Sequence, residues 1–122
     1  MRFRFLLAAL PALMLGLAGE AHAHSKLKSS VPANGATVSE KFKEARLDFI
    51  EPVEAAMSHF ELVTSEGKLV LRAEGAKACK AKICRFAVEP LEPGAYRIDY
   101  HIFSADGHVV EGKIRFTVKA GQ

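Results

Sequence analysis

The sequence predicts an all-β domain, an immunoglobulin-like Greek-key β-sandwich or barrel of about seven strands. Three observations support this fold class. Apolar and polar residues alternate with a period of two through most of the chain after residue 44, which is typical of strands with one buried face. Segments rich in glycine and proline separate these runs. No segment after the N-terminal region has a helical apolar period of useful length.

The clearest strand is predicted over 95–103. One face of this run carries the apolar side chains and the other carries Arg97, Asp99 and His101. Similar alternation predicts further strands at 45–51, 58–64, 68–72, 83–89 and 112–118. Turn signals fall at 32–36, 65–67, 89–95 and 105–107.

Two local features complete this assignment. Pro52 has no N–H for a β-ladder, so it marks a strand end or bulge. The segment 38–45 is compatible with a short helical turn that Ser39 would cap.

The N-terminal 23 residues have the pattern of a secretory signal peptide. Arg2 and Arg4 precede an apolar stretch at 6–19, and Ala21 and Ala23 form a small-x-small cleavage site. Cleavage after Ala23 leaves a domain of residues 24–122, which we expect to be exported and not embedded in the membrane. A retained membrane anchor and cleavage after Ala21 are the alternatives.

Composition excludes one class of partner. The chain has a net charge of +3, and its basic residues are scattered among acidic ones rather than gathered with aromatic residues. A nucleic-acid-binding surface is therefore not predicted. With 49% hydrophobic and 25% charged residues, the composition is that of an ordinary globular domain.

Cleavage after Ala23 would make His24 the first residue. Its α-amine and imidazole Nδ1 could then close one chelate ring on a metal ion, because the amine loses its proton readily near neutral pH. Such nitrogen ligands suit Cu(II). The simpler interpretation is that this N-terminal histidine binds nothing.

Asp106 and His108 lie two positions apart in the motif Ser104–His108. In an extended segment both side chains would project to the same side, and Gly107 between them adds no bulk. Together with His24 they would provide an amine, two imidazoles and a carboxylate. This is a plausible tetragonal set for Cu(II), although Zn²⁺ can also use two histidines and an aspartate. A turn that merely contains a histidine is the alternative.

The sequence from residue 24 onward resembles the periplasmic copper-resistance CopC family, including its YobA-like members. The resemblance rests on "HSKLKSSVPANGATV", "LDFIEPVE" and, most specifically, "PGAYRIDYHIFSADGHVVEGKIRFTV" at 93–118. The family pattern there usually has Trp where this chain has Tyr100. Tyr100 is also a large aromatic residue suited to a core, so this departure does not affect the expected fold.

The resemblance implies one Cu(II) ion per chain, bound by the amine and imidazole of His24, by Asp106 and by His108. Glu51 matches an acidic position near the metal, as an outer group or an occasional ligand. A surface carboxylate is its alternative role. The implied function is copper homeostasis or resistance, or delivery to a membrane copper transporter. A CopD-type inner-membrane copper permease is the implied partner.

Many family members also have a methionine-rich loop that holds Cu(I). The comparable stretch here contains no methionine, and after residue 23 only Met57 remains, with His59 nearby. We therefore expect no Cu(I) site, and we expect Met57 and His59 to serve packing or surface roles. His101 is expected to be exposed or to lie outside the metal's immediate ligands.

Cys79 and Cys84 are expected to form a disulfide in an exported domain. A thiolate Cu(I) site is the alternative. Two other functions remain open: a copper-dependent oxidative enzyme with an N-terminal histidine chelate, and a structural β-sandwich module. The chain contains no Trp and is short for an extended substrate-binding face, so we do not predict an enzyme.

Overall fold

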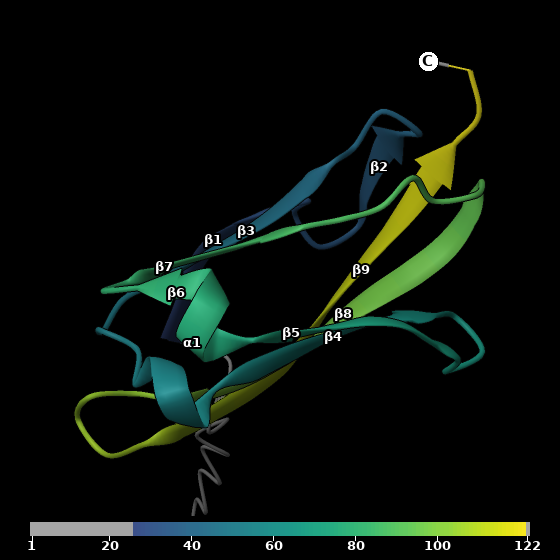
Figure 1. Cartoon of the computed structure of the whole chain (residues 1–122). Coiled ribbons are helices and arrows are strands. Elements are labelled where there is room, and N and C mark those ends of the chain that lie inside the picture. The colour runs from purple at the N-terminus through teal and green to yellow at the C-terminus, as the bar shows by residue number, and fades with distance from the viewer. Residues whose placement is uncertain (1–25, 122) are drawn as a thin grey trace, which may run out of the picture.

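The computed structural model describes residues 26–121, and these form two β-sheets packed face to face (Figure 1). One sheet has four strands in the order β1-β3-β7-β6, and the other has five in the order β2-β9-β8-β4-β5. The four-stranded sheet contains β1 Leu27–Val31, β3 Glu44–Phe49, β6 Cys79–Lys80 and β7 Ile83–Ala87. The five-stranded sheet contains β2 Ala36–Ser39, β4 His59–Thr64, β5 Leu69–Glu74, β8 Gly94–Phe103 and β9 Val109–Lys119. The predicted all-β sandwich is confirmed.

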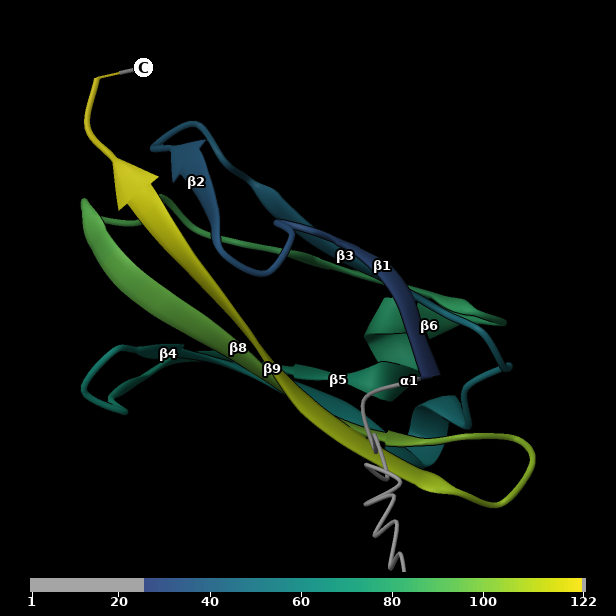
Figure 2. The ribbon, with the colours of Figure 1, turned by 180° about the vertical axis from the view of Figure 1, so that it is seen from behind.

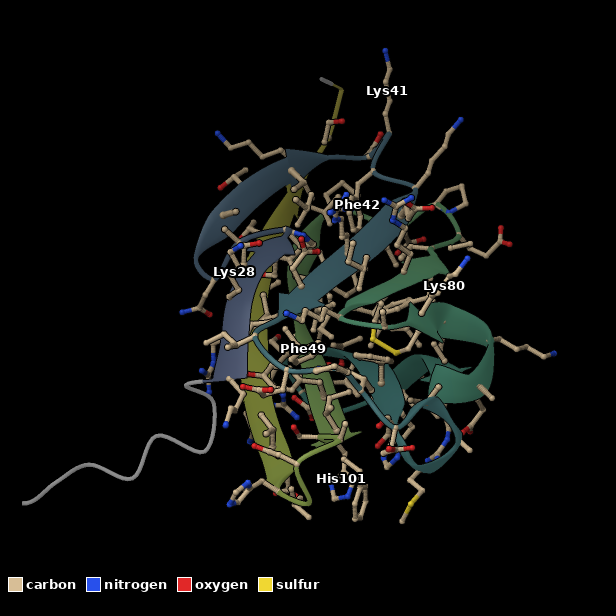
Figure 3. The ribbon with its side chains drawn as sticks, turned by 90° about the vertical axis from the view of Figure 1, so that its left-hand side faces the viewer. Lys28, Lys41, Phe42, Phe49, Lys80 and His101 are labelled. Atoms are coloured by element: carbon tan, nitrogen blue, oxygen red, sulfur yellow. A yellow bond between two sulfur atoms is a disulfide. The ribbon has the colours of Figure 1, made fainter. Side chains whose placement is uncertain are left out.

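The core lies between the two sheets because each long strand turns alternate side chains inward. The fully buried side chains include Leu47 from β3, Phe60 and Leu62 from β4, and Ile98 from β8. Phe49 and Tyr100 meet edge to face across the interior, with ring centroids 5.7 Å apart. Figure 3 shows Phe49 turned inward, whereas Lys28, Lys41 and Lys80 extend outward. Tyr100 therefore serves as the expected core aromatic.

The β8–β9 hairpin is the longest ladder of the molecule. Antiparallel pairing runs from Gly94 opposite Val118 to Phe103 opposite Val109. β4 pairs antiparallel with the other edge of β8, and β2 pairs parallel with β9. The connection between β8 and β9 and the 3-10 helix η2 Ala55–Met57 lie at one end of the sandwich. β2 and the C-terminal end lie at the other (Figures 1 and 2).

Three strands of the structure fall outside the predicted runs: β1, β2 and β6. All three lie at the edges of their sheets, and β2 has only four residues. None shows clean alternation of apolar and polar residues, because a strand at a sheet edge can expose side chains on both of its faces. The short helix α1 Gly75–Ala78 and η2 were also not predicted.

The expected helical turn at 38–45 is instead a hydrogen-bonded turn after β2. The N–H of Phe42 donates to the Ser39 carbonyl at 3.1 Å, and the N–H of Lys41 donates to Ser39 Oγ at 3.1 Å. Ser39 therefore caps the segment as proposed, but β3 begins at Glu44 before a helix can extend.

The expected disulfide is present. Cys79 in β6 and Cys84 in β7 are register partners and their sulfurs are bonded, so the thiolate alternative has no free ligands here. Within the described residues, no helix has the length and apolar character needed to cross a membrane.

Candidate metal centre

The motif Ser104–His108 connects β8 to β9, as the turn signal predicted. The N–H of Ser104 donates to the His108 carbonyl at 2.8 Å, and the N–H of Gly107 donates to the Ser104 carbonyl at 2.9 Å. Gly107 has φ of 89°, a left-handed conformation that glycine adopts at little cost. This glycine therefore allows the compact turn that carries the two candidate ligands.

Asp106 and His108 meet at the tip of this turn. Asp106 Oδ1 lies 3.1 Å from His108 Nδ1 and accepts a hydrogen bond from the His108 N–H at 3.3 Å. We expected the two side chains to share one side of an extended segment, and that reason is wrong. The chain is turned here, and the aspartate contacts the backbone two residues on, as in an Asx turn.

Lys26 was missed by the sequence reasoning. Its ammonium lies 3.1 Å from Asp106 Oδ2, across 80 residues of sequence. Both carboxylate oxygens of Asp106 are thus in contact with donors, one with His108 and the other with Lys26. The only sequence signal that could have indicated Lys26 is its position two residues after His24.

These contacts set the electrostatics of the turn. The Ser104 hydroxyl, the His108 imidazole and the Lys26 ammonium, in that order, hold the pKa of Asp106 well below its usual range. Ser104 is 4% exposed, and its Oγ makes no hydrogen bond of good geometry within residues 26–121. It therefore acts on Asp106 through proximity and retains unused hydrogen-bonding capacity. Asp106 stays ionised at neutral pH, as a ligand carboxylate must.

Glu51 lies between the N-terminal strand and the turn. The N–H of Ile50 donates to the Lys26 carbonyl at 2.8 Å, and the Pro52 carbonyl accepts from the Ala105 N–H at 2.8 Å. These two bonds hold the backbone on either side of Glu51 against the segments that carry Lys26 and Asp106. Its side chain is half-buried.

His24 lies outside the described residues. Within residues 26–121, no three His, Cys, Asp or Glu side chains are arranged to hold a metal ion. The structure brings Asp106 and His108 together. The backbone beside Glu51 is bonded to the same region, but the Glu51 side chain does not form a three-ligand group with them.

The turn can still provide two donors suited to a transition metal. The His108 side chain is 71% exposed, and its Nε2 makes no hydrogen bond within the described part of the chain. The Nδ1 contact places Asp106 on the opposite side of the ring from Nε2, so the two side chains can bind one ion only after the His108 ring turns to bring a nitrogen and the carboxylate to a common point. One imidazole nitrogen and one carboxylate fit Cu(II) or Zn²⁺ and need further ligands from elsewhere.

Comparison with known proteins points to one family. The family model described as the CopC domain matches residues 27–119. Copper resistance protein C of Escherichia coli is 34% identical over 116 residues, covering 88% of this chain and 90% of that protein. Protein YobA of Escherichia coli K12 is 30% identical over 118 residues, covering 95% and 94% respectively.

Solved structures agree with this match. CopC from Methylosinus trichosporium OB3b superposes with a TM-score of 0.73 at 33% identity, covering 81% of this chain and 97% of that one. PcoC, a copper resistance protein from Escherichia coli, superposes with a TM-score of 0.56 at 28% identity, covering 76% and 98%.

Proposed function

The chain belongs to the CopC family, and on that premise we propose that it is an exported copper-binding protein of copper resistance or homeostasis. Its relatives are named copper resistance proteins. In this proposal, residues 1–23 are a signal peptide removed in the periplasm, and residues 24–122 are the functional domain. The domain binds and hands over copper and does not catalyse a reaction.

The Lys26–Asp106 contact is the observation that carries this proposal. Cleavage after Ala23 would leave only His24 and Ser25 ahead of Lys26. Two residues of extended chain span at most about 7 Å. A mature N-terminus at His24 would therefore begin within about 7 Å of Lys26, the residue whose side chain contacts Asp106 in the turn.

The proposed ligands of one Cu(II) ion are the amine and imidazole of His24, the Asp106 carboxylate and the His108 imidazole. Glu51 lies outside this set or joins it occasionally. The Lys26 ammonium occupies Asp106 Oδ2, so binding through that oxygen requires the metal to displace the lysine. The Cu(II) ion would then take the place of the Lys26 ammonium beside the ionised Asp106 carboxylate.

The donor chemistry favours Cu(II) over Cu(I). Soft thioether ligands select Cu(I), and one related structure is described as a methionine-rich copper resistance protein. In this chain Met57 is the only methionine after residue 23. By family resemblance, we further propose that the copper is passed to a CopD-type inner-membrane permease.

The test is a Cu(II) titration followed by electron paramagnetic resonance on protein whose first residue is His24. One extra glycine ahead of His24 should lower Cu(II) affinity by orders of magnitude, because it removes the terminal amine from the chelate. A glycine added after Gln122 is the matched control and should change nothing. Equal affinity in the N-terminally extended protein would exclude the amine ligand.

A further inference from the structure

A second cluster of imidazole and carboxylate groups lies on the outer face of the five-stranded sheet. His59 in β4 is the register partner of His101 in β8. His101 is in turn the partner of Glu111 in β9. The three side chains therefore form a row across three neighbouring strands, because opposed positions in a ladder project to the same face.

The row is held in place by specific contacts. The His59 and His101 rings stack with centroids 5.1 Å apart and planes 19° apart. Glu111 Oε1 lies 2.6 Å from His101 Nδ1. Phe103, two residues along β8, packs edge-on against the His101 ring at 5.5 Å. The His101 ring is thus fixed by neighbours on three sides while its side chain remains 33% exposed.

The surroundings favour a cation. The row borders a shallow surface hollow lined by the carboxylates of Glu61, Asp99 and Glu111 and by the ammonium of Lys113. Asp99 is paired with Arg97 at 2.6 Å, which leaves the two glutamates against one lysine. Arg72 on β5, whose charge acts on His59, is paired with Glu74 at 2.7 Å.

From this arrangement we propose that His59 and His101 bind a divalent transition-metal ion on the sheet face, with Glu111 orienting His101. A carboxylate on one imidazole nitrogen that leaves the other nitrogen free is the usual outer arrangement of a metal-binding histidine. Imidazole ligands suit Cu(II), Ni(II) and Zn(II). Water would complete the coordination, since only two protein nitrogens bind directly.

The His59 ring has to turn before the two rings can share one ion, because the His101 ring is held by its neighbours. Two nitrogens that each lie about 2.0–2.1 Å from a metal are at most about 4 Å apart. The stacked rings have centroids 5.1 Å apart and planes 19° apart, so their in-plane lone pairs point side by side. His59 must therefore turn about its side-chain torsions until one of its nitrogens and Nε2 of His101 face a common point. A two-nitrogen site of this kind is weaker than a chelate with four donors.

This site is separate from the turn that carries Asp106 and His108. The pairs Ile102–Val110 and Phe103–Val109 lie between the His101–Glu111 pair and the turn. Figure 3 labels His101 near one end of the sandwich, opposite Lys41. The proposed ligands are all within the described residues and depend on neither His24 nor signal cleavage. The inference is therefore independent of the proposed function.

The experiment uses the His108→Ala variant of protein that begins at His24, so that the turn contributes no imidazole. Zn²⁺ is added while ¹H–¹⁵N NMR spectra are recorded, including the histidine side-chain resonances. The imidazole signals of His59 and His101 should shift together and saturate with one apparent Kd. His59→Gln or His101→Gln, each added separately, should abolish these shifts.

Glu111→Gln tests whether Glu111 orients His101. Glu61→Gln is the matched control, because it removes the same charge from the same hollow without touching His101. Glu111→Gln should weaken Zn²⁺ binding by about tenfold, and Glu61→Gln by about twofold or less. Thermal melts would show that each variant is folded. Shifts confined to residues 104–108, shifts that survive both histidine substitutions, or equal effects of the two glutamine variants would overturn the proposal.

Discussion

Residues 26–121 contain two imidazole–carboxylate pairs that are built in different ways. His108 and Asp106 are two residues apart and meet in a tight turn. His101 and Glu111 are ten positions apart in number and meet because β8 and β9 pair in register. The first pair is joined by Lys26 from the start of the described chain, and the second by His59 from β4.

The difference shows what each construction provides. The turn places a very exposed histidine at the end of the sandwich, where a chain terminus can complete a ligand set. The sheet holds His101 more rigidly, between the His59 ring, the edge of Phe103 and the Glu111 carboxylate, but no chain terminus is proposed to add donors there. We therefore expect tight binding at the turn and weak binding on the sheet.

The largest expected effect separates the two pairs directly. His108→Ala should lower the affinity of the proposed Cu(II) site by about two orders of magnitude or more, because it removes a proposed direct ligand, and even outer groups contribute 10–100-fold. His101→Ala should leave that tight affinity within about twofold. Competition titration with a Cu(II) chelator measures both. If His101→Ala were as damaging as His108→Ala, the two pairs would belong to one site.

The disulfide is expected to affect stability without affecting either pair. Replacing Cys79 and Cys84 together with serine should lower the free energy of unfolding by about 2 kcal/mol, since the bridge closes only a short loop. Urea unfolding measures this change, and the chelator titration should show unchanged Cu(II) affinity. A loss of Cu(II) affinity in the folded double variant would mean that β6 and β7 support the turn.

Gly112→Ala tests the packing beneath the row formed by His59, His101 and Glu111. A Cβ at Gly112 would overlap the hydroxyl and ring of buried Tyr100, so the variant should lose about 1–3 kcal/mol of stability. Thermal or urea unfolding measures the loss. Adding Tyr100→Leu should make the combined loss smaller than the sum of the two single losses. Strict additivity would show that the strain lies elsewhere.

The smallest expected effect concerns Lys26. Lys26→Met should tighten Cu(II) binding by about two- to fivefold, because the metal no longer displaces the lysine from an exposed ion pair, and such pairs contribute little. Lys28→Met is the control, since it removes the same charge from an exposed position two residues away. Equal tightening in both variants would attribute the effect to net charge instead of to the Asp106 contact.

Much of the fold could be predicted because the physical signal is local. The strands β3, β4, β7, β8 and β9 each bury every second side chain, and this alternation of apolar and polar residues is visible in the sequence. β1, β2 and β6 could not be found in this way. β1 and β2 are held mainly by ladder hydrogen bonds to β3 and β9 and not by their own apolar pattern. The two-residue β6 is held by pairing and a disulfide to the neighbouring β7.

The all-β class, the Cys79–Cys84 disulfide and the closeness of Asp106 and His108 could be predicted from the sequence, because each prediction depends on residues near one another in the chain. The contact of Lys26 with Asp106 and the row of His59, His101 and Glu111 follow from the tertiary structure alone. Which side chains oppose one another across strands depends on register, and register is set by the packing of the whole sheet. A histidine at position 101 was therefore predictable as outward-facing, whereas its partners were not.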